Sequence, residues 1–425
     1  AARADAFGGG MLWPDAIAEP AEPEFAQLPF DHPLWVVYSS GTTGMPKPIV
    51  HGHGGIVLVQ LALKTFHNNC KPSDVYMWFT SSGWIMWNAQ VAALMTGATV
   101  AIYDGSPAWP DMGVLWQFAE NARVSHFGAG AAFYTGCMKA GVEPRTIADT
   151  SQIHSVGATG SPLPAQAYAW LQEQLGTHVW ISPMSGGTDF AGSFVGGVPL
   201  LPVRAGEMQA RLLGAKVEAF DEAGHSVVDQ VGELVCTVPM PSMPLYFWGD
   251  MDGRRYHDSY FDMYPGTWRH GDWIKITPTG GSIIYGRSDA TINRQGIRMG
   301  TAELYRVVEE LPEVLDSLVV DLEYLGRESY MALFVKMREG QALTDALKGT
   351  INTRIKQALS ARHVPNEIVA APDVPRTLSG KKMEVPIKKL LLGQPLEKVA
   401  SADAMANPAC LNFYAQFAQR FTGAA

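Results

Sequence analysis

The sequence predicts an α/β fold: a large N-terminal α/β domain with a β-rich subdomain, followed by a small, mobile α+β domain. Two observations lead to this prediction. From Leu34 to about residue 182, short apolar runs alternate with longer amphipathic runs, an order typical of a mainly parallel sheet covered by helices. After about residue 211 the pattern changes to short strands and turns, and near Gly286 to a compact mixture of helices and strands. A chain of 425 residues is also long enough for two or more domains.

We divide the chain into three parts. Residues 1–33 are rich in Ala, Pro and acidic residues and are interpreted as a linker or lead-in. Residues 34–286 are predicted to form the C-terminal part of an ATP- and acyl-binding large domain. Residues 287–425 are predicted to form the small domain, with a hinge at residues 287–290, where the sequence is polar and turn-rich.

Individual elements are predicted from the spacing of apolar residues. In the large domain we expect a buried strand at 34–40, further strands at 75–79, 98–103 and 178–182, and helices at 54–69, 112–123 and 164–176. The β-rich part is expected to hold strands at 212–220, 232–238, 272–277 and 281–286. In the small domain we expect helices at 301–314, 343–360 and 408–421 and strands at 316–324 and 330–337.

Composition argues against several classes of function. The formal net charge of -9 leaves no electrostatic footprint for DNA or RNA. The four cysteines are far apart, without CxxC or paired-histidine spacing, and are interpreted as free thiols in a reducing compartment. No run is apolar for long enough to span a bilayer, and no secretory signal is visible. We therefore expect a cytoplasmic protein with small-molecule substrates and no nucleic-acid or membrane partner.

The segment YSSGTTGMPKPIV (38–50) combines hydroxyl groups, glycines and one lysine directly after a predicted strand. Backbone N–H groups at glycines, hydroxyl donors and a cation together can hold a polyphosphate. Ligands of parallel α/β sheets also bind beyond the carboxyl ends of the strands. Judged alone, the segment is equally typical of a surface turn.

Two further clusters follow glycine-rich turns. In GATGSPL (157–163) small residues could let a flat ligand lie against the backbone, although an ordinary strand–helix turn has the same composition. In SPMSGGTDF (182–190) the hydroxyl of Thr188 could contact phosphate and the carboxylate of Asp189 could serve Mg²⁺. An Asx-type turn is the alternative for this second cluster.

Three more clusters lie towards the C-terminus. Asp272 in TWRHGDW could accept hydrogen bonds from ribose hydroxyls or could occupy a hairpin turn. The segment YGRSDATINRQGIRMG (285–300) carries three arginines suited to phosphate, or it is a solvated loop. Lys381, after a Ser-Gly turn in PRTLSGKKMEVPIKK, could neutralise charge that develops in a transition state or could lie on the plain surface.

The order of these clusters, rather than any one of them, resembles the acyl-adenylate-forming (AMP-binding) superfamily from about Leu34 to Lys389. Three phrases are most similar to the branch of this family that activates acetoacetate: PFDHPLWVVYSSGTTGMPKPIVHGHGG, FTSSGWIMWN and MPLYFWGDMDGRRYHDSYF. The resemblance implies an acid–thiol ligase that makes acetoacetyl-CoA from acetoacetate, ATP and CoA through acetoacetyl-AMP, releasing AMP and pyrophosphate with Mg²⁺ as cofactor. It also implies that a substantial N-terminal portion of the large domain precedes Ala1. A ligase for another short acid such as propionate, and a non-catalytic nucleotide-binding fragment, are the alternatives.

The resemblance implies a role for each matching position. Lys381 would bridge the attacking carboxylate and the α-phosphate, and Asp289 would be the hinge. Thr188 would contact the α-phosphate, Asp189 the metal, Asp272 and Arg287 the ribose, and Arg298 a phosphate. The remaining nucleotide-binding positions would be Ser39, Ser40, Gly41, Thr42, Thr43, Gly44 and Lys47 at the β- and γ-phosphates, Gly157, Ala158 and Thr159 beside the adenine or acyl group, and Gly187 and Gly296.

The acyl pocket is expected at Trp84, Ser185 and Gly186. Relatives that activate acetate carry bulky tryptophans immediately before the Thr-acid pair, where this chain has Ser185, Gly186 and Gly187. Small residues there would leave room for an acid longer than acetate. On this interpretation Gly186→Trp should shift the preference of the enzyme towards acetate.

Overall fold

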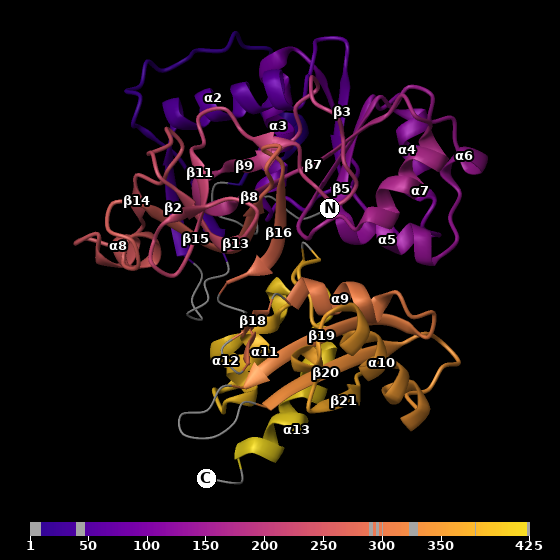
Figure 1. Ribbon diagram of the computed structural model, residues 1–425. Helices are drawn as coiled ribbons and strands as arrows, with labels where there is room; N and C mark the ends of the chain where they lie inside the picture. The colour runs from indigo at the N-terminus through magenta and orange to yellow at the C-terminus, as the bar shows by residue number, and fades with distance from the viewer. Residues whose placement is uncertain are drawn as a thin grey trace.

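The computed structural model describes residues 10–39, 47–288, 292–294, 297–299, 301–322, 330–378 and 380–422, with the backbone alone at 292–294, 297–299 and 422. Figure 1 shows two bodies, an upper one that contains the chain up to β16 and a lower one that contains the rest. Residues 10–32 are exposed and contain one short helix, α1 (Trp13–Ala16).

A five-stranded parallel sheet forms the centre of the upper body, in the order β4-β3-β5-β6-β7. The predicted parallel sheet with flanking helices is therefore confirmed. The strands are β3 (Val75–Trp78), β4 (Thr99–Ala101), β5 (His126–Gly130), β6 (Ser155–Thr159) and β7 (Trp180–Pro183). The surrounding helices are α2 (His53–Ala62), α3 (Ile85–Val91), α4 (Val114–Asn121), α5 (Ala131–Lys139), α6 (Pro144–Ile147) and α7 (Ala165–Leu175), with a π-helical turn η2 (Leu63–His67) and a 3₁₀ turn η3 (Ala92–Thr96).

Strands β5 and β6 were not expected, because their sequences HFGAG and SVGAT are dominated by small residues. The structure supplies the reason. A Cβ on Gly128 would lie 2.1 Å from the ring of Trp78, and a Cβ on Gly157 would lie 2.5 Å from it. The two glycines allow the indole of β3 to lie across its neighbouring strands.

The strand predicted at 34–40 does not belong to the parallel sheet, and its prediction as a buried strand is wrong. It forms β1 (Pro33–Ser39), which is only partly buried and pairs antiparallel with β2 (Lys47–Gly52). The short connection between the two strands explains this pairing, since parallel neighbours need a crossover of a dozen or more residues. β14 (Tyr246–Phe247) completes this three-stranded sheet.

Two antiparallel sheets make up the expected β-rich part. One has the order β12-β11-β13-β15-β16 and the other the order β10-β9-β8. The strands are β8 (Ser185–Gly187), β9 (Gly192–Gly196), β10 (Ala210–Arg211), β11 (Val217–Phe220), β12 (Ser226–Val227), β13 (Val231–Cys236), β15 (Trp268–Ile276) and β16 (Ser282–Arg287), with the 3₁₀ turn η4 (Thr188–Phe190) and helix α8 (Arg254–Tyr260). Asp272 lies within β15, so the hairpin-turn alternative for this residue is wrong.

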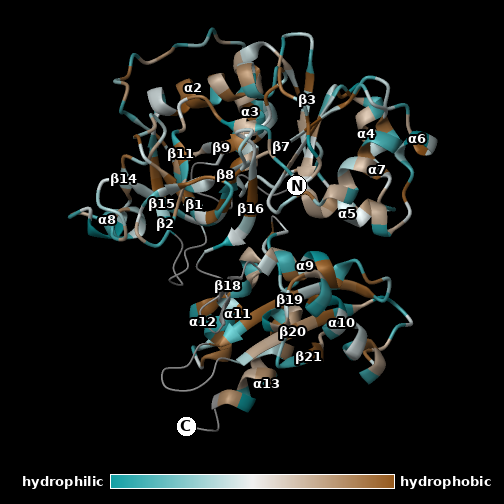
Figure 2. Ribbon diagram, in the orientation of Figure 1, coloured by the Kyte–Doolittle hydropathy of each residue, from teal (hydrophilic) through white to brown (hydrophobic). Residues whose placement is uncertain are grey.

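The lower body is the α+β unit expected from the sequence. It holds a sheet in the order β19-β20-β21 and a separate pair of strands, β17 with β18. Its elements are β17 (Ile292–Arg294), β18 (Ile297–Met299), α9 (Thr301–Glu309), β19 (Val314–Leu322), β20 (Tyr330–Met337), α10 (Asp345–Ala358), η5 (Ala361–His363), β21 (Glu367–Ala370), α11 (Glu384–Leu391), α12 (Leu396–Val399), η6 (Ala402–Ala404), η7 (Pro408–Cys410) and α13 (Leu411–Thr422). Hydrophobic residues are concentrated along β19 and β20, which form the centre of this body (Figure 2).

The two bodies have separate hydrophobic cores. Three buried clusters lie between residues 49 and 276, and two lie between residues 304 and 418. This separation agrees with a division near residue 287, although the exact domain boundary and the hinge at 287–290 stay predictions. Across the part of the chain that the structure describes, no helix is long and apolar enough to cross a membrane.

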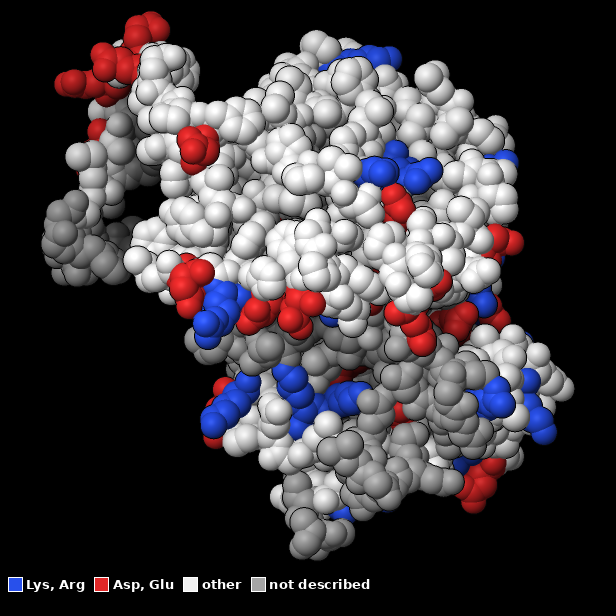
Figure 3. Space-filling view, turned by 60° about the vertical axis from the view of Figure 1, so that its left-hand side comes forward, with Lys and Arg blue, Asp and Glu red and all other residues white. Residues whose placement is uncertain are grey.

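Side chains of α5 and α7 join the two bodies. The Nζ atom of Lys139 donates to the carbonyl oxygen of Leu315 at 2.5 Å, and Arg338 donates to the carbonyl oxygen of Lys139 at 3.4 Å. Gln166 donates to Glu310 at 2.9 Å. Figure 3 shows acidic side chains along the lower rim of the upper body and Lys and Arg side chains on the lower body beneath them. These contacts place one face of the lower body against the upper body.

Candidate active site

The turn η4 presents Thr188 and Asp189 between β8 and β9. His51 of β2 holds the turn, because its Nε2 lies 3.0 Å from the carbonyl oxygen of Asp189. Trp35 donates to Nδ1 of His51 at 3.0 Å, so Nδ1 is the acceptor and Nε2 carries the hydrogen of a neutral ring. Burial lowers the pKa of His51 to about 4, which agrees with a neutral imidazole.

The carboxylate of Asp189 is largely buried and paired with a cation and a phenol. Tyr260 donates a hydrogen bond to its Oδ1, and the Nζ atom of Lys47 lies 3.8 Å from the same oxygen. Burial alone would raise the pKa of Asp189, but Lys47, His270 and Tyr260 outweigh it and hold this pKa below its usual value. Asp189 is therefore a carboxylate in the folded protein.

Lys47 is itself positioned by aromatic rings. Its Nζ lies 4.6 Å from the ring centroid of Tyr260 and 5.9 Å from that of Phe247. A cation over an aromatic face is attracted by the ring quadrupole. Tyr260 in turn stacks on Trp268 with ring centroids 3.7 Å apart. The lysine predicted at the end of the phosphate loop thus points towards the predicted metal carboxylate.

The pair Asp272–Arg287 lies across the β15–β16 ladder, where the two residues are direct register partners. Nη1 of Arg287 is 3.4 Å from Oδ1 of Asp272. Between Asp272 and His270, Gly271 adopts a φ of 88°, a left-handed conformation that favours glycine. His270 is buried and its Nε2 lies 3.8 Å from Oδ2 of Asp272.

Lys381 comes from the lower body and follows a tight turn. The N–H of Lys381 is 3.1 Å from Oγ1 of Thr377, and its carbonyl oxygen accepts from the N–H of Thr377 at 2.9 Å. Lys381 is exposed. Desolvation lowers the pKa of Lys381 and Arg287 adds to this effect, while the carboxylates of Asp272 and Asp189 oppose it. The charged groups that act on Lys381, Asp272, Arg287 and Asp189, therefore all belong to the upper body.

The neighbouring lysine has a different environment. The Nζ of Lys382 contacts Glu309 at 2.5 Å and Asp316 at 3.0 Å, and it lies 3.5 Å from the ring centroid of Tyr305. These partners belong to the lower body, so Lys382 anchors the segment, whereas the charged groups that act on Lys381 belong to the upper body.

The other predicted site residues are distributed unevenly. Ser39 ends β1 opposite Lys47, Thr188 forms no side-chain hydrogen bond with another described residue, and the hydroxyl of Thr159 donates to the carbonyl oxygen of Met184 at 2.8 Å. Gly157 and Ala158 are buried within β6, and a Cβ on Gly187 would lie 2.5 Å from His270.

The following lie outside the described residues: Ser40, Gly41, Thr42, Thr43, Gly44, Asp289, Gly296 and the side chain of Arg298.

The structure changes the interpretation of the expected acyl pocket. Trp84 packs, partly buried, against a core cluster, and Ser185 pairs with Val195 in the ladder of β8 and β9. A Cβ on Gly186 would lie 2.0 Å from the carbonyl oxygen of Gly192. A side chain at position 186 therefore meets the backbone of β9, and Gly186→Trp is not a clean test of pocket length.

Sequence reasoning missed three residues that shape the site: His51, Tyr260 and His270. His51 and Tyr260 contact Asp189 from distant elements. His270 lies in the same strand as Asp272 and within the segment TWRHGDW, but no sequence pattern indicated a role for it. In the described chain no group of three or more His, Cys, Asp or Glu could hold a metal ion. A single carboxylate such as Asp189 fits Mg²⁺ that takes its other ligands from substrate phosphates and water.

The site agrees with the order of motifs in the sequence. It combines a buried carboxylate, an Asp–Arg pair in a β-sheet and a lysine from the second body. The AMP-binding enzyme family matches residues 6–246. The chain belongs to this family. The resemblance noted from the sequence is therefore confirmed.

Curated relatives and solved structures agree. Acetoacetyl-CoA synthetase of Gallus gallus is 42% identical over 392 residues, which cover 92% of this chain and 58% of the relative. Acetoacetyl-coenzyme A synthetase of Rhizobium meliloti is 41% identical over 417 residues, which cover 98% of this chain and 64% of the relative. The solved acetoacetyl-CoA synthetase from Streptomyces lividans superimposes with a TM-score of 0.89 at 48% identity, covering 96% of this chain and 62% of that one.

An anthranilate CoA ligase in complex with anthranoyl-AMP is similar in fold alone, with a TM-score of 0.75 at 20% identity. The chain spans about three fifths of the length of the relatives named as acetoacetyl-CoA synthetases.

Proposed function

We propose that this chain forms the adenylating site of an ATP-dependent acid–thiol ligase that acts on acetoacetate. The observation that supports this most is the position of Lys381, which comes from the lower body and lies in the electrostatic field of Asp272, Arg287 and Asp189. Acetoacetate as substrate is supported by relatives named as acetoacetyl-CoA synthetases.

The reaction has two halves. A carboxylate oxygen of acetoacetate attacks the α-phosphorus of ATP, the bond to the β-phosphate oxygen breaks, and pyrophosphate leaves. The thiol of CoA then attacks the acyl carbon of acetoacetyl-AMP, loses its proton and displaces AMP. Both steps develop negative charge on oxygen, which preorganised cations and N–H donors stabilise.

The side chains divide this work. Lys381 neutralises charge between the attacking carboxylate and the α-phosphate, and Lys47 stabilises the departing pyrophosphate. Asp272 and Arg287 hold the ribose, and Thr188 donates to the α-phosphate. Mg²⁺, when bound at Asp189, supplies charge neutralisation at the phosphates. The predicted loop residues 39–44 complete the phosphate site, and the small domain rotates about residue 289 between the half-reactions.

Pyrophosphate release from ATP tests the proposal. We expect release that depends on acetoacetate, exceeds that with propionate, and is followed by acetoacetyl-CoA formation when CoA is present. Preferential release with propionate would indicate a ligase for another short acid. ATP binding without release for any acid would indicate a nucleotide-binding protein and would contradict the proposal. The cytoplasmic location expected from the sequence stays a prediction.

A further inference from the structure

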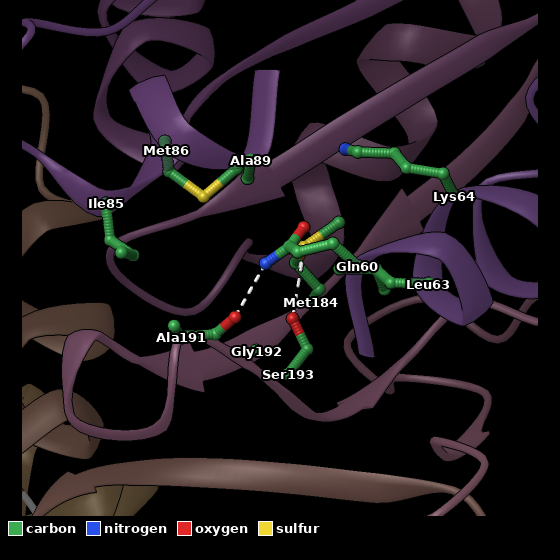
Figure 4. A pocket seen from close by; sticks show the side chains of 10 residues that line it. All are labelled: Gln60, Leu63, Lys64, Ile85, Met86, Ala89, Met184, Ala191, Gly192 and Ser193. Atoms are coloured by element: carbon green, nitrogen blue, oxygen red, sulfur yellow. Dashed lines mark hydrogen bonds between the residues drawn. The ribbon is translucent and has the colours of Figure 1, made fainter. Parts of the chain in front are cut away.

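A small pocket lies between the α2–η2 helix, α3 and the start of β9 (Figure 4). The pocket is small: the space not filled by atoms is about 290 Å³, and this volume includes open solvent. The lining residues are Gln60, Leu63, Lys64, Ile85, Met86, Ala89, Met184, Ala191, Gly192 and Ser193. Met184 and Ala191 flank the segment that carries Thr188 and Asp189, and Ile85 follows Trp84. The pocket therefore adjoins the predicted phosphate and acyl residues.

The helix that lines this pocket has an unusual distribution of polar residues. Between residues 53 and 67, Gln60 and Lys64 are buried, whereas Leu58 and Leu61 are exposed. Helices of globular proteins normally bury their apolar face. Hydrophobic packing thus does not explain why the two polar side chains point inwards, and a function for them is a better explanation.

Gln60 presents an acceptor to the pocket. Its Nε2 donates to the carbonyl oxygen of Ala191 at 2.6 Å, which fixes the orientation of the amide because a carbonyl needs a donor. The other amide atom, Oε1, is buried and has no hydrogen-bond partner among the described residues. A buried acceptor without a partner is costly, and a ligand donor or a water would satisfy it.

Lys64 presents a donor from the next turn. Its side chain is 0% exposed, and its Nζ donates to the hydroxyl of Tyr76 at 2.8 Å and to Oδ1 of Asn68 at 3.2 Å. An ammonium has three N–H groups, so two acceptors leave one N–H. Within the described chain no carboxylate pairs with Lys64, and burial lowers its pKa from 10.5 to about 7. The residue lies in a π-helical turn, a distortion frequent at functional sites.

We propose that this pocket is the far end of the acyl site and that Lys64 is a specificity-determining residue for acids with an oxygen on C3. The inference rests on the proposed function. Lys64 donates a hydrogen bond to the 3-oxo oxygen, and Oε1 of Gln60 accepts one from the enol hydroxyl or from an accompanying water. An unsubstituted acid of the same length makes neither contact and leaves the third N–H of the buried ammonium without an acceptor.

The experiment compares acetoacetate with butyrate, which has the same carbon chain without the 3-oxo group. In the wild-type chain kcat/KM for acetoacetate should exceed that for butyrate. Lys64→Met keeps the length of the side chain and removes the donor, and it should lower the acetoacetate value roughly 10- to 100-fold while leaving the butyrate value within about twofold. Lys64→Arg should restore part of the preference. Lys216→Met, at an exposed lysine, controls for the substitution itself.

Folding is checked separately by circular dichroism and thermal unfolding, because Lys64→Met leaves the hydroxyl of Tyr76 and Oδ1 of Asn68 without the hydrogen bond that Lys64 donates. Equal losses for acetoacetate and butyrate in a folded Lys64→Met protein would overturn the proposal.

Failure of the proposed function would be recognised separately, as absence of turnover by the wild type with every acid. In that case the dissociation constants of acetoacetate and butyrate are measured for the wild type and Lys64→Met. A preference for acetoacetate that disappears in Lys64→Met supports the proposal, and an unchanged ratio of the two constants overturns it.

Discussion

Tyr260 donates a hydrogen bond to the carboxylate of Asp189, across 71 positions of sequence. The same ring stacks on Trp268 and lies beneath the ammonium of Lys47. One tyrosine therefore contacts both the predicted metal carboxylate and the predicted pyrophosphate lysine. This relationship connects α8 to the turn that presents Thr188.

Tyr260→Phe should move the acid limb of the pH–activity profile to higher pH. The substitution keeps the ring stack and removes one hydrogen bond that holds the pKa of Asp189 low. Asp189 acts as a carboxylate, so activity is lost when it is protonated as the pH falls. If its pKa is raised, this loss begins at a higher pH. The measurement is acetoacetate-dependent pyrophosphate release against pH. Tyr256→Phe is the matched control, since Tyr256 contacts the Tyr260 ring but not Asp189, and an unshifted limb in Tyr260→Phe would contradict this role.

Lys139→Ala should slow adenylation more than thioester formation. The ammonium of Lys139 joins α5 to the carbonyl oxygen of Leu315 and lies 3.8 Å from Glu309. These contacts belong to the arrangement in which Asp272 and Asp189 act on Lys381. Loss of these contacts, worth roughly 1–2 kcal/mol, should reduce the rate of the first half-reaction about 5- to 30-fold. Single-turnover assays of each half-reaction check this, with Lys348→Ala on the exposed face of α10 as control. Equal slowing of both halves would show that Lys139 does not favour one arrangement.

Gly186→Ala should destabilise the upper body. A Cβ there would collide with the carbonyl oxygen of Gly192, and strands β8 and β9 would have to separate. Overpacking of this kind costs roughly 1–3 kcal/mol. Urea unfolding followed by tryptophan fluorescence measures the loss. Gly83→Ala is the control: a Cβ on Gly83 meets no atom within 4 Å, so this substitution should leave the urea midpoint unchanged. Gly214→Ala would not serve, because the φ of Gly214 is positive.

His126→Phe should stabilise the protein more in acid than at neutral pH. Both ring nitrogens of His126 are buried without a partner in the described chain, and the ring stacks on Tyr76 at 4.4 Å. Burial lowers its pKa from 6.5 to about 3, so the unfolded state binds more protons and stability falls as pH decreases below 6.5. Removing the imidazole should therefore raise the free energy of unfolding by about 2 kcal/mol more at about pH 5 than at about pH 8.

The free energy of unfolding at the two pH values tests this effect, with the exposed His178→Gln as control. A gain that does not change with pH would contradict the assignment to His126.

The order of polar clusters allowed the sequence to predict the family and the parallel sheet. Asp189, Asp272, Arg287 and Lys381 belong to short motifs that the resemblance covers, and their roles at the site stay predictions. Tyr260 and His51 could not be predicted, because they act through tertiary contacts with Asp189. Strands β5 and β6 were missed because the ring of Trp78 requires glycines where β-branched residues would otherwise indicate a strand.

The measurement that tests the central claim most directly separates the half-reactions in Lys381→Ala. Exchange of labelled pyrophosphate into ATP reports adenylation of acetoacetate, and supplied acetoacetyl-AMP with CoA reports thioester formation. If Lys381 stabilises charge at the α-phosphate, exchange should fall by roughly 100-fold or more, while thioester formation from the supplied adenylate stays within about threefold. Equal loss of both half-reactions, or full exchange without the lysine, would contradict the proposed adenylating site.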